Sequence, residues 1–262
     1  MRAIEVNQHM NGLIDDLPED TVDRVIYGDP DREVNGIAVA WMPYRETVER
    51  AAEQGANLLV VHEPTFYDHR ELDRDGQYLA EAAAKKQLID EVGITVIRCH
   101  DVWDAMPEIG IPYAWGDFLG LSDFVKQVRH YNVYKVPEQT AGAFANHVAD
   151  RTATLGQQTI WFYGDPERRI RTVGLGTGCI SNPFRSFELG ADLAISVDDV
   201  VRAWIAGEWC RDTGRPLVVV NHCVSEEPGM VTLAAYLEKA FPGTPVTHIA
   251  QGCSYEPVVS SK

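Results

Sequence analysis

The sequence predicts an α/β fold built from two similar halves, with mixed, mostly parallel sheets that carry helices on both faces. Three observations lead to this prediction. Helical periodicity alternates with short apolar segments that are typical of buried strands. A helix-to-strand junction with the pattern E-x-G-A-[ND]-L occurs twice, and so does an apolar strand that ends in histidine with an acid four residues later. The 262 residues, 45% of them apolar, suffice to bury a substantial core.

The first part of the chain predicts two helices and two strands in alternation. A glycine follows each helical segment, Gly55 and Gly93, as is common just past a helix C-terminus. The apolar segments after these glycines are short and partly β-branched, which favours buried strands. The expected helices are 45–54 and 76–92, and the expected strands are 57–61 and 94–99.

The rest of the chain continues the alternation, beginning with a helix near residue 117. The glycine-rich segment 174–178 lacks the spacing of a dinucleotide fingerprint and the lysine of a P-loop, so a tight turn is the favoured interpretation. Further helices are expected at 141–153 and 228–241, and strands at 131–136, 159–164, 171–176, 191–197 and 215–220.

The repeated patterns indicate an ancient duplication. Residues 53–58 match residues 188–193, and the strand before His100 is echoed by the strand before His222. Ligands bind outside the carboxyl ends of strands in α/β sheets, so a pseudo-dyad between the halves would bring equivalent strand ends to one crevice. The expected halves are residues 1–125 and 126–262.

Six polar residues follow apolar strands in these two halves. Imidazoles and carboxylates without a thiolate suit a dinuclear metal centre, in which a carboxylate bridges two ions and a water is activated. A single histidine at a strand end is more often structural, with ligation in about one case in five. The joint occurrence at corresponding strand ends favours ligation. The residues are His62, Glu63, His100, Asp104, His222 and Glu226.

Three segments around these residues form an ordered set of motifs: GANLLVVHEPTFY (55–67), HDVWDA (100–105) and HCVSEEPG (222–229). They resemble the G-A-D-L-[IV]-[IV]-x-H-H-P-L-x-[FW], H-x-x-x-D-A and H-x-x-[TS]-E-x-x-G motifs of the Nif-three-like family. This family is named for NGG-one-interacting factor three and is often labelled GTP cyclohydrolase I type 2. Order and approximate spacing agree along nearly the whole chain.

The resemblance implies two intertwined α/β halves, a two-metal centre and a ring-like homohexamer whose inner cavity the metal sites face. His100 would lie beside the metals as a hydrogen-bonding group or proton carrier, so that His100 and Glu226 are the catalytic candidates. The implied metal ligands are His62 and His222 for one ion, Glu63 and Asp104 for the other, and Glu226 for both.

The chain departs from the family where the family has a second histidine and this chain has Glu63. Two imidazoles and three carboxylates are a harder donor set, which suits Mn, Mg or Fe(II) better than Zn, although Zn binds more tightly when all ions are offered equally. The family's tryptophan-aspartate-asparagine motif is not found near the N-terminus, and its second-half lysine and histidine are absent from 196–202. We expect two divalent ions per chain, drawn from Mn, Fe, Zn and Mg.

The composition argues against several classes of partner. The chain has 23 Lys+Arg against 39 Asp+Glu and a net charge of −16, which repels nucleic acid and anionic membranes. No signal peptide or membrane-spanning segment is found, which predicts a cytoplasmic protein. The five cysteines show no C-x-x-C spacing, so reduced thiols are expected, with Cys99 and Cys223 in the core.

Two functions remain open. The first is a metal-dependent hydrolase acting on a nucleotide-like, cyclic-amide or phosphoester small molecule, where the nucleotide comes from the family label alone. The second is a non-catalytic, metal-stabilised oligomer that binds protein partners or a regulatory ligand. The sequence contains no dedicated substrate motif. Asp68, His69 and Arg70 follow the first motif closely enough to rim the site, without an assigned role.

Overall fold

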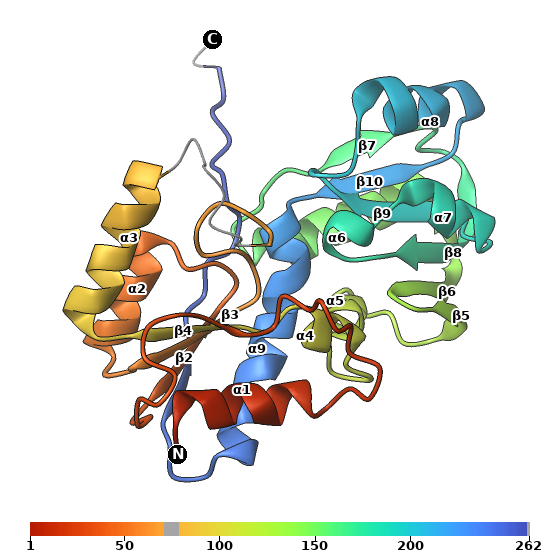
Figure 1. Ribbon diagram of the computed structural model, residues 1–262. Coiled ribbons are helices and arrows are strands. Elements are labelled where there is room, and N and C mark those ends of the chain that lie inside the picture. The colour runs from red at the N-terminus through yellow and green to blue at the C-terminus, as the bar shows by residue number, and fades with distance from the viewer. Residues whose placement is uncertain (71–78, 261–262) are drawn as a thin grey trace. The chain divides into compact units, whose positions relative to one another are not determined.

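A computed structural model of the protein describes residues 1–70 and 79–260 (Figure 1). The start of the expected helix 76–92 therefore lies outside the described residues. The chain forms two compact units, and each is made of two stretches of sequence. The first unit comprises Met1–Gly110 and Met230–Ala250, and the second comprises Ile111–Gly229 and Gln251–Lys262.

The first unit contains a five-stranded sheet in the order β1-β4-β3-β2-β11. Strands β4, β3, β2 and β11 are parallel neighbours, and β1 pairs antiparallel with β4 at one edge. Every residue of β2, β3 and β4 is buried, as expected for parallel strands covered on both faces. The strands are β1 (Val25–Tyr27), β2 (Ile37–Ala40), β3 (Leu58–Val61), β4 (Thr95–Arg98) and β11 (Val246–His248).

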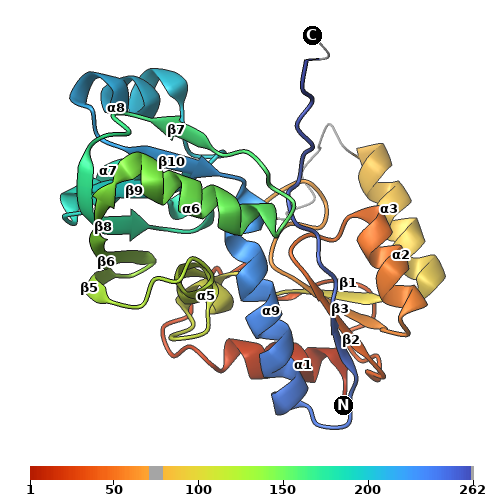
Figure 2. The ribbon, with the colours of Figure 1, turned by 180° about the vertical axis from the view of Figure 1, so that it is seen from behind.

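Helices α2 and α3 lie side by side against the first sheet (Figures 1 and 2). Val48 and Ala51 of α2 and Ile89 of α3 form one hydrophobic core with alternate residues of β2, β3 and β4. Gly55, just past α2, adopts a φ of +79°, which a residue with a Cβ rarely adopts. The helices of this unit are α1 (Ala3–Asn11), α2 (Arg45–Glu53), α3 (Leu79–Val92), α4 (Asp101–Ala105) and the second half of α9 (His222–Ala240).

The second unit contains a six-stranded sheet in the order β5-β6-β8-β9-β10-β7. Strands β8, β9 and β10 are parallel at its centre, and the pairings of β5, β6 and β7 are antiparallel. The strands are β5 (Phe124–Val128), β6 (Tyr131–Thr140), β7 (Trp161–Tyr163), β8 (Arg169–Leu175), β9 (Leu193–Val197) and β10 (Leu217–Val220).

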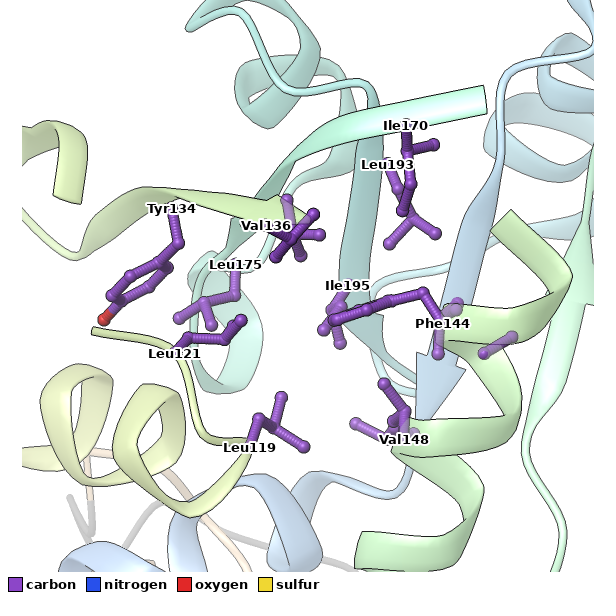
Figure 3. Close-up of a cluster of buried hydrophobic side chains, with 14 of the residues drawn as sticks. Leu119, Leu121, Tyr134, Val136, Phe144, Val148, Ile170, Leu175, Leu193 and Ile195 are labelled. Atoms are coloured by element: carbon purple, nitrogen blue, oxygen red, sulfur yellow. The ribbon is translucent and has the colours of Figure 1, made fainter. Parts of the chain in front are cut away.

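Helices cover both faces of the second sheet. Figure 3 shows Phe144 and Val148 of α6 pointing toward Ile195 of β9 in the larger core cluster. A second cluster on the other face joins Phe187 of α7 and Cys210 of α8 to β9 and β10. The helices are α5 (Ile111–Phe118), α6 (Ala141–Ala153), α7 (Pro183–Glu188), α8 (Glu208–Thr213) and the first half of α9, with shorter helical turns at Gly178–Ile180 and Ala203–Gly207.

The predicted fold class is confirmed, and the expected helix at 141–153 has the bounds predicted for it. One expected helix was wrong at its start: α9 begins at His222, not at residue 228. His100 likewise caps the N-terminus of α4. The two histidines therefore follow their strands and open helices, so that the acid four residues later lies one helical turn away on the same face.

The two units repeat one succession of elements. The first runs β2, α2, β3, α3, β4, α4, and the second runs β8, α7, β9, α8, β10, α9. The repeated E-x-G-A-[ND]-L pattern lies at the α2–β3 junction and again at the α7–β9 junction. No helix in the described part of the chain is long and apolar enough to cross a membrane.

Candidate metal centre

The first donor cluster begins at the carboxyl end of β3. The backbone N–H groups of His62 and Glu63 both donate to the carbonyl of Trp41, which turns the chain out of the sheet. His62 is fully buried, and its Nδ1 lies 3.1 Å from the carbonyl oxygen of Cys99. A carbonyl only accepts, so Nδ1 carries the hydrogen and Nε2 presents its lone pair. Nε2 lies 3.9 Å from Oδ1 of Asp104.

Helix α4 supplies the other members of this cluster. Asp104 lies one helical turn after His100, and its Oδ2 is 3.8 Å from His100 Nδ1. The imidazole rings of His62 and His100 stack with centroids 4.5 Å apart. Donor atoms of His62, His100 and Asp104 all lie within 4.8 Å of one another. The imidazole of His62 and the buried carboxylate of Asp104 are donor types that suit a divalent transition metal, and His100 lies beside them.

The start of α4 is held by a residue from the N-terminal region. Asp23 accepts hydrogen bonds from the backbone N–H groups of His100 (2.7 Å), Asp101 (3.1 Å) and Val102 (2.8 Å). These are helix N–H groups that have no partner within the helix itself. Burial raises the pKa of Asp23, and the N–H groups partly oppose that shift. Asp23 therefore fixes the position of His100 without contacting its ring.

His100 and Asp101 form an ion pair with 2.9 Å between Nδ1 and Oδ1. Burial alone would lower the pKa of His100, but the hydrogen bond to Asp101 and the charges of Asp104 and Glu63 raise that pKa to about 9. The same hydrogen bond holds the pKa of Asp101 well below its usual value. A protonated His100 is a donor rather than a ligand, which suits the proton carrier expected from the sequence.

Arg98 is a fully buried cation at the end of β4. Its Nε donates to the carbonyl of His62 (3.0 Å), its Nη2 donates to Nδ1 of His69 (3.1 Å), and Nη2 lies 3.6 Å from Oε2 of Glu63. Burial and the charge of Arg98 lower the pKa of His69. Glu63 and His69 form a second group with His100 whose donor atoms lie within 4.8 Å of one another. Glu63 is thus placed beside a guanidinium as well as beside imidazoles.

The second donor cluster lies at the start of α9. His222 Nδ1 is 2.7 Å from Oδ2 of Asp199, and the backbone N–H of His222 donates to Oδ1 of Asp198. Asp199 therefore sets the tautomer of His222, with the hydrogen on Nδ1. Nε2 lies 3.1 Å from Oε1 of Glu226, one turn along the helix, and Glu226 is 2% exposed. The hydrogen bond from His222 lowers the pKa of Asp199.

Gly178 closes over these donors from the turn that follows β8. A Cβ at this position would lie 2.5 Å from Oε1 of Glu226 and 2.8 Å from Nε2 of His222, and φ is +49°. A side chain here would fill the space in front of both donor atoms, which only glycine leaves open. Together with the imidazole and carboxylate donors, this space fits a bound cation.

The structure thus brings most predicted site residues into groups within their own units. His62, His100 and Asp104 come together, Glu63 is grouped with His100, and His222 lies beside Glu226. No sequence motif indicated the residues that orient these donors, which are Asp23, Arg98, Asp198 and Asp199. Asp198 and Asp199 follow a predicted strand directly, as His62 and Glu63 do, and that position was a signal for them.

The fold and these donor groups define a class: α/β proteins of two repeated units with candidate metal-binding clusters at the ends of their central strands. The chain belongs to the Duf34/NIF3 (NGG1p interacting factor 3) family, whose model matches residues 9–256. This match confirms the family resemblance predicted from the three motifs. No curated protein matches the chain by sequence.

Solved structures share the fold at low sequence identity. The hypothetical protein SA1388 from Staphylococcus aureus superposes with a TM-score of 0.82 at 15% identity, covering 99% of both chains. A Bacillus cereus protein related to NIF3 gives a TM-score of 0.80 at 13% identity, again over 99% of both chains. TTHA1606 from Thermus thermophilus gives 0.74 at 21% identity, over 97% of this chain and 100% of that one.

Proposed function

We propose that the protein binds two divalent metal ions per chain and uses them to hydrolyse a small molecule. The observation that carries this proposal is the repeated helix start. In each unit a buried parallel strand leads to a histidine whose acid partner lies one turn later. The proposed ligands are His62, Glu63 and Asp104 in the first unit and His222 and Glu226 in the second.

The chemistry of the donors supports a metal of the first transition row or Mg. Imidazole suits Zn and Fe, and carboxylates suit Mn and Mg. Nδ1 of His62 donates to a backbone carbonyl, and Nδ1 of His222 donates to a carboxylate. In this orientation Nε2 of each ring faces the neighbouring acid. Such hydrogen bonds to the second ring nitrogen are the usual support of metal-binding histidines.

Bound ions would supply Lewis acidity and a water of lowered pKa, which is the chemistry of hydrolysis of phosphoesters and amides. His100 would carry a proton, because its ring is partly exposed, is paired with Asp101 and is held in place by Asp23. Glu226 would act from within the second cluster as a ligand and base. The proposed substrates are nucleotide-like molecules, cyclic amides or phosphoesters.

Metal analysis tests the first half of the proposal. We expect close to two ions per chain in protein purified without chelator, and a sharp fall in the folded variants His62→Ala, Asp104→Ala and Glu226→Ala. His147 is an exposed histidine whose Nε2 donates to the carbonyl of Leu119, and the control variant His147→Ala should keep its metal. Protein that contains no metal and takes up none on titration would contradict metal binding.

A substrate panel tests the second half. Metal-loaded protein is assayed for hydrolysis of nucleotides, phosphoesters and cyclic amides beside Glu226→Gln, which keeps the size of the side chain. Turnover that depends on Glu226 supports the hydrolase. Metal binding without any Glu226-dependent turnover across the panel would instead favour the non-catalytic alternative, a metal-stabilised oligomer that binds partners.

We also propose that the chain assembles into a homo-oligomer, with six copies as the family resemblance implies. A net charge of −16 opposes association, so the interfaces must be apolar enough to offset repulsion. Large apolar side chains are exposed in the second unit, among them Trp204 (71%), Val125 (56%) and Trp161 (55%). Light scattering that returned the monomer mass at micromolar concentration would refute this assembly.

A further inference from the structure

Cys179 differs from the other cysteines of the chain in being exposed. Cys99, Cys210 and Cys223 are buried, and Cys253 is intermediate. Burial raises the pKa of each of the three buried thiols, which suits inert core residues. Cys179 therefore stands apart as an accessible thiol, and its surroundings decide what it can do.

Three neighbouring parallel strands carry three metal-type donors at their carboxyl ends. Cys179 lies in the turn after β8, Asp199 follows β9, and His222 follows β10. Donor atoms of these three residues all lie within 4.8 Å of one another. A thiol, a carboxylate and an imidazole are all donor types that bind divalent transition metals, and here they come from the carboxyl ends of three neighbouring strands.

The turn that carries Cys179 is held firmly against β9. Ser181 Oγ donates to the carbonyl of Gly178 (2.9 Å) and accepts from the backbone N–H of Val197 (3.0 Å). The hydroxyl of Ser196 donates to the carbonyl of Ser181. The same turn places Gly178 over the donor atoms of His222 and Glu226. The thiol is thus presented from a fixed backbone immediately beside the proposed second cluster.

We infer that Cys179 is a metal ligand whose thiolate joins the imidazole of His222 in holding a thiophilic divalent transition-metal ion such as Zn. This inference rests on the proposed metal binding and extends it to the ligand set and metal class of the second cluster. The Sγ–metal bond forms as the S–H bond breaks, and the proton leaves to solvent. The hydrogen bond between Asp199 and Nδ1 fixes the orientation of the His222 ring. A sulfur donor shifts the site toward soft ions.

Cobalt substitution tests the sulfur ligand directly. Co(II) is added to the metal-stripped full chain, and the near-ultraviolet absorption is recorded. We expect a sulfur-to-cobalt charge-transfer band in the wild type that is absent from Cys179→Ser and retained in Cys253→Ser, the matched control. Cobalt bound without this band, or a band that survives in Cys179→Ser, would overturn the inference while leaving metal binding intact. A wild type that binds no cobalt or zinc would overturn both.

Alkylation of the wild-type chain provides a second test that does not depend on a variant folding. Metal-stripped protein is treated with iodoacetamide with and without Zn, and modification of each cysteine is followed by mass spectrometry. Coordination should slow alkylation of Cys179 on the order of tenfold or more, because the metal occupies the sulfur lone pair that reacts. Cys253 should react at the same rate in both samples. Equal rates for Cys179 in Zn-loaded and Zn-free protein would contradict the inference.

Discussion

The two units follow the same succession of strands and helices but use the ends of their central strands differently. After β3 come His62 and Glu63, and each belongs to a donor group that also contains His100. After β9 come Asp198 and Asp199, and both are engaged with the start of α9. In the first unit the corresponding helix start is held by Asp23, far away in sequence. Equivalent positions thus carry candidate metal donors in the first unit and, in the second unit, residues that hydrogen-bond to His222.

The charge surroundings of the clusters differ as well. The first contains a fully buried guanidinium, Arg98, which lies against Glu63 and His69. The second is built around His222 with Asp198, Asp199 and Glu226. A buried cation offsets the cost of a buried carboxylate, whereas exposed acids such as Asp199 are stabilised by solvent. We therefore expect loss of a charged group to be more costly in the first cluster.

The largest expected effect is that of Arg98→Ala. The substitution leaves Glu63 buried without its cation and should lower the unfolding free energy of metal-stripped protein by about 3–5 kcal/mol. Asp199→Ala in the second cluster should cost about 1 kcal/mol or less, since the Asp199 side chain is 61% exposed. Denaturant unfolding measures both. The Arg98→Ala/Glu63→Gln double variant should recover part of the loss, and no recovery would show that Glu63 is not the residue left uncompensated.

The next effect is a pH dependence confined to the first cluster. The folded pKa of His100 is raised to about 9, above the unfolded value of about 6.5. The contribution of protonated His100 to the unfolding free energy is therefore fully present below about pH 6.5 and is lost as pH rises toward 9. The stability advantage of metal-stripped wild type over His100→Gln should shrink by roughly 1–3 kcal/mol between about pH 6 and pH 9.5. A difference that stays constant over this range would show that the His100–Asp101 pair does not titrate as inferred.

A glycine pair probes the second cluster alone. Gly178→Ala places a Cβ against His222 Nε2 and Glu226 Oε1, whereas Gly190→Ala has a positive φ of +101° with nothing within 4 Å. Each should cost about 1 kcal/mol or more in stability through backbone strain, and Gly178→Ala should cost more than Gly190→Ala because its Cβ must displace His222 or Glu226. Only Gly178→Ala should also weaken metal binding, on the order of tenfold, at one of the two sites. Equal metal affinity in the two variants would count against a cation at this position.

The smallest effect expected is a change of metal preference at Glu63. Glu63→His replaces an anionic oxygen donor by a neutral nitrogen, so the Mn-to-Zn occupancy ratio after exposure to equimolar ions should fall by roughly two- to fivefold. The effect is modest because Arg98 already offsets part of the Glu63 charge. Glu63→Gln removes the negative charge but keeps an oxygen donor. Comparing the two variants therefore separates the effect of charge on the Mn-to-Zn ratio from the effect of the donor atom. An unchanged ratio in Glu63→His would mean that Glu63 does not bind the metal.

Local sequence pattern predicted many of the secondary elements of this protein and the types of side chain that follow its central strands. Short apolar runs that follow Gly55, Gly93 and Gly214 predicted β3, β4 and β10 within one or two residues, because parallel strands buried on both faces need continuous apolar segments. The four-residue spacing in His100–Asp104 and His222–Glu226 was visible as well. Its meaning changed once the helices were seen to begin at or next to the histidines, since a spacing of four then places both side chains on one face.

Only the tertiary structure decided which residues orient those donors. Asp23 and His100 are 77 residues apart, Arg98 and His69 are 29 apart, and His222 and Asp199 are 23 apart. Cys179 joins its group because β8, β9 and β10 are adjacent and parallel, and strand order depends on how the whole chain packs. Periodicity describes which face of an element is buried. Periodicity carries no information about which distant polar group forms a hydrogen bond with a buried donor or acceptor. The partner depends on which polar groups are buried together when the whole chain folds.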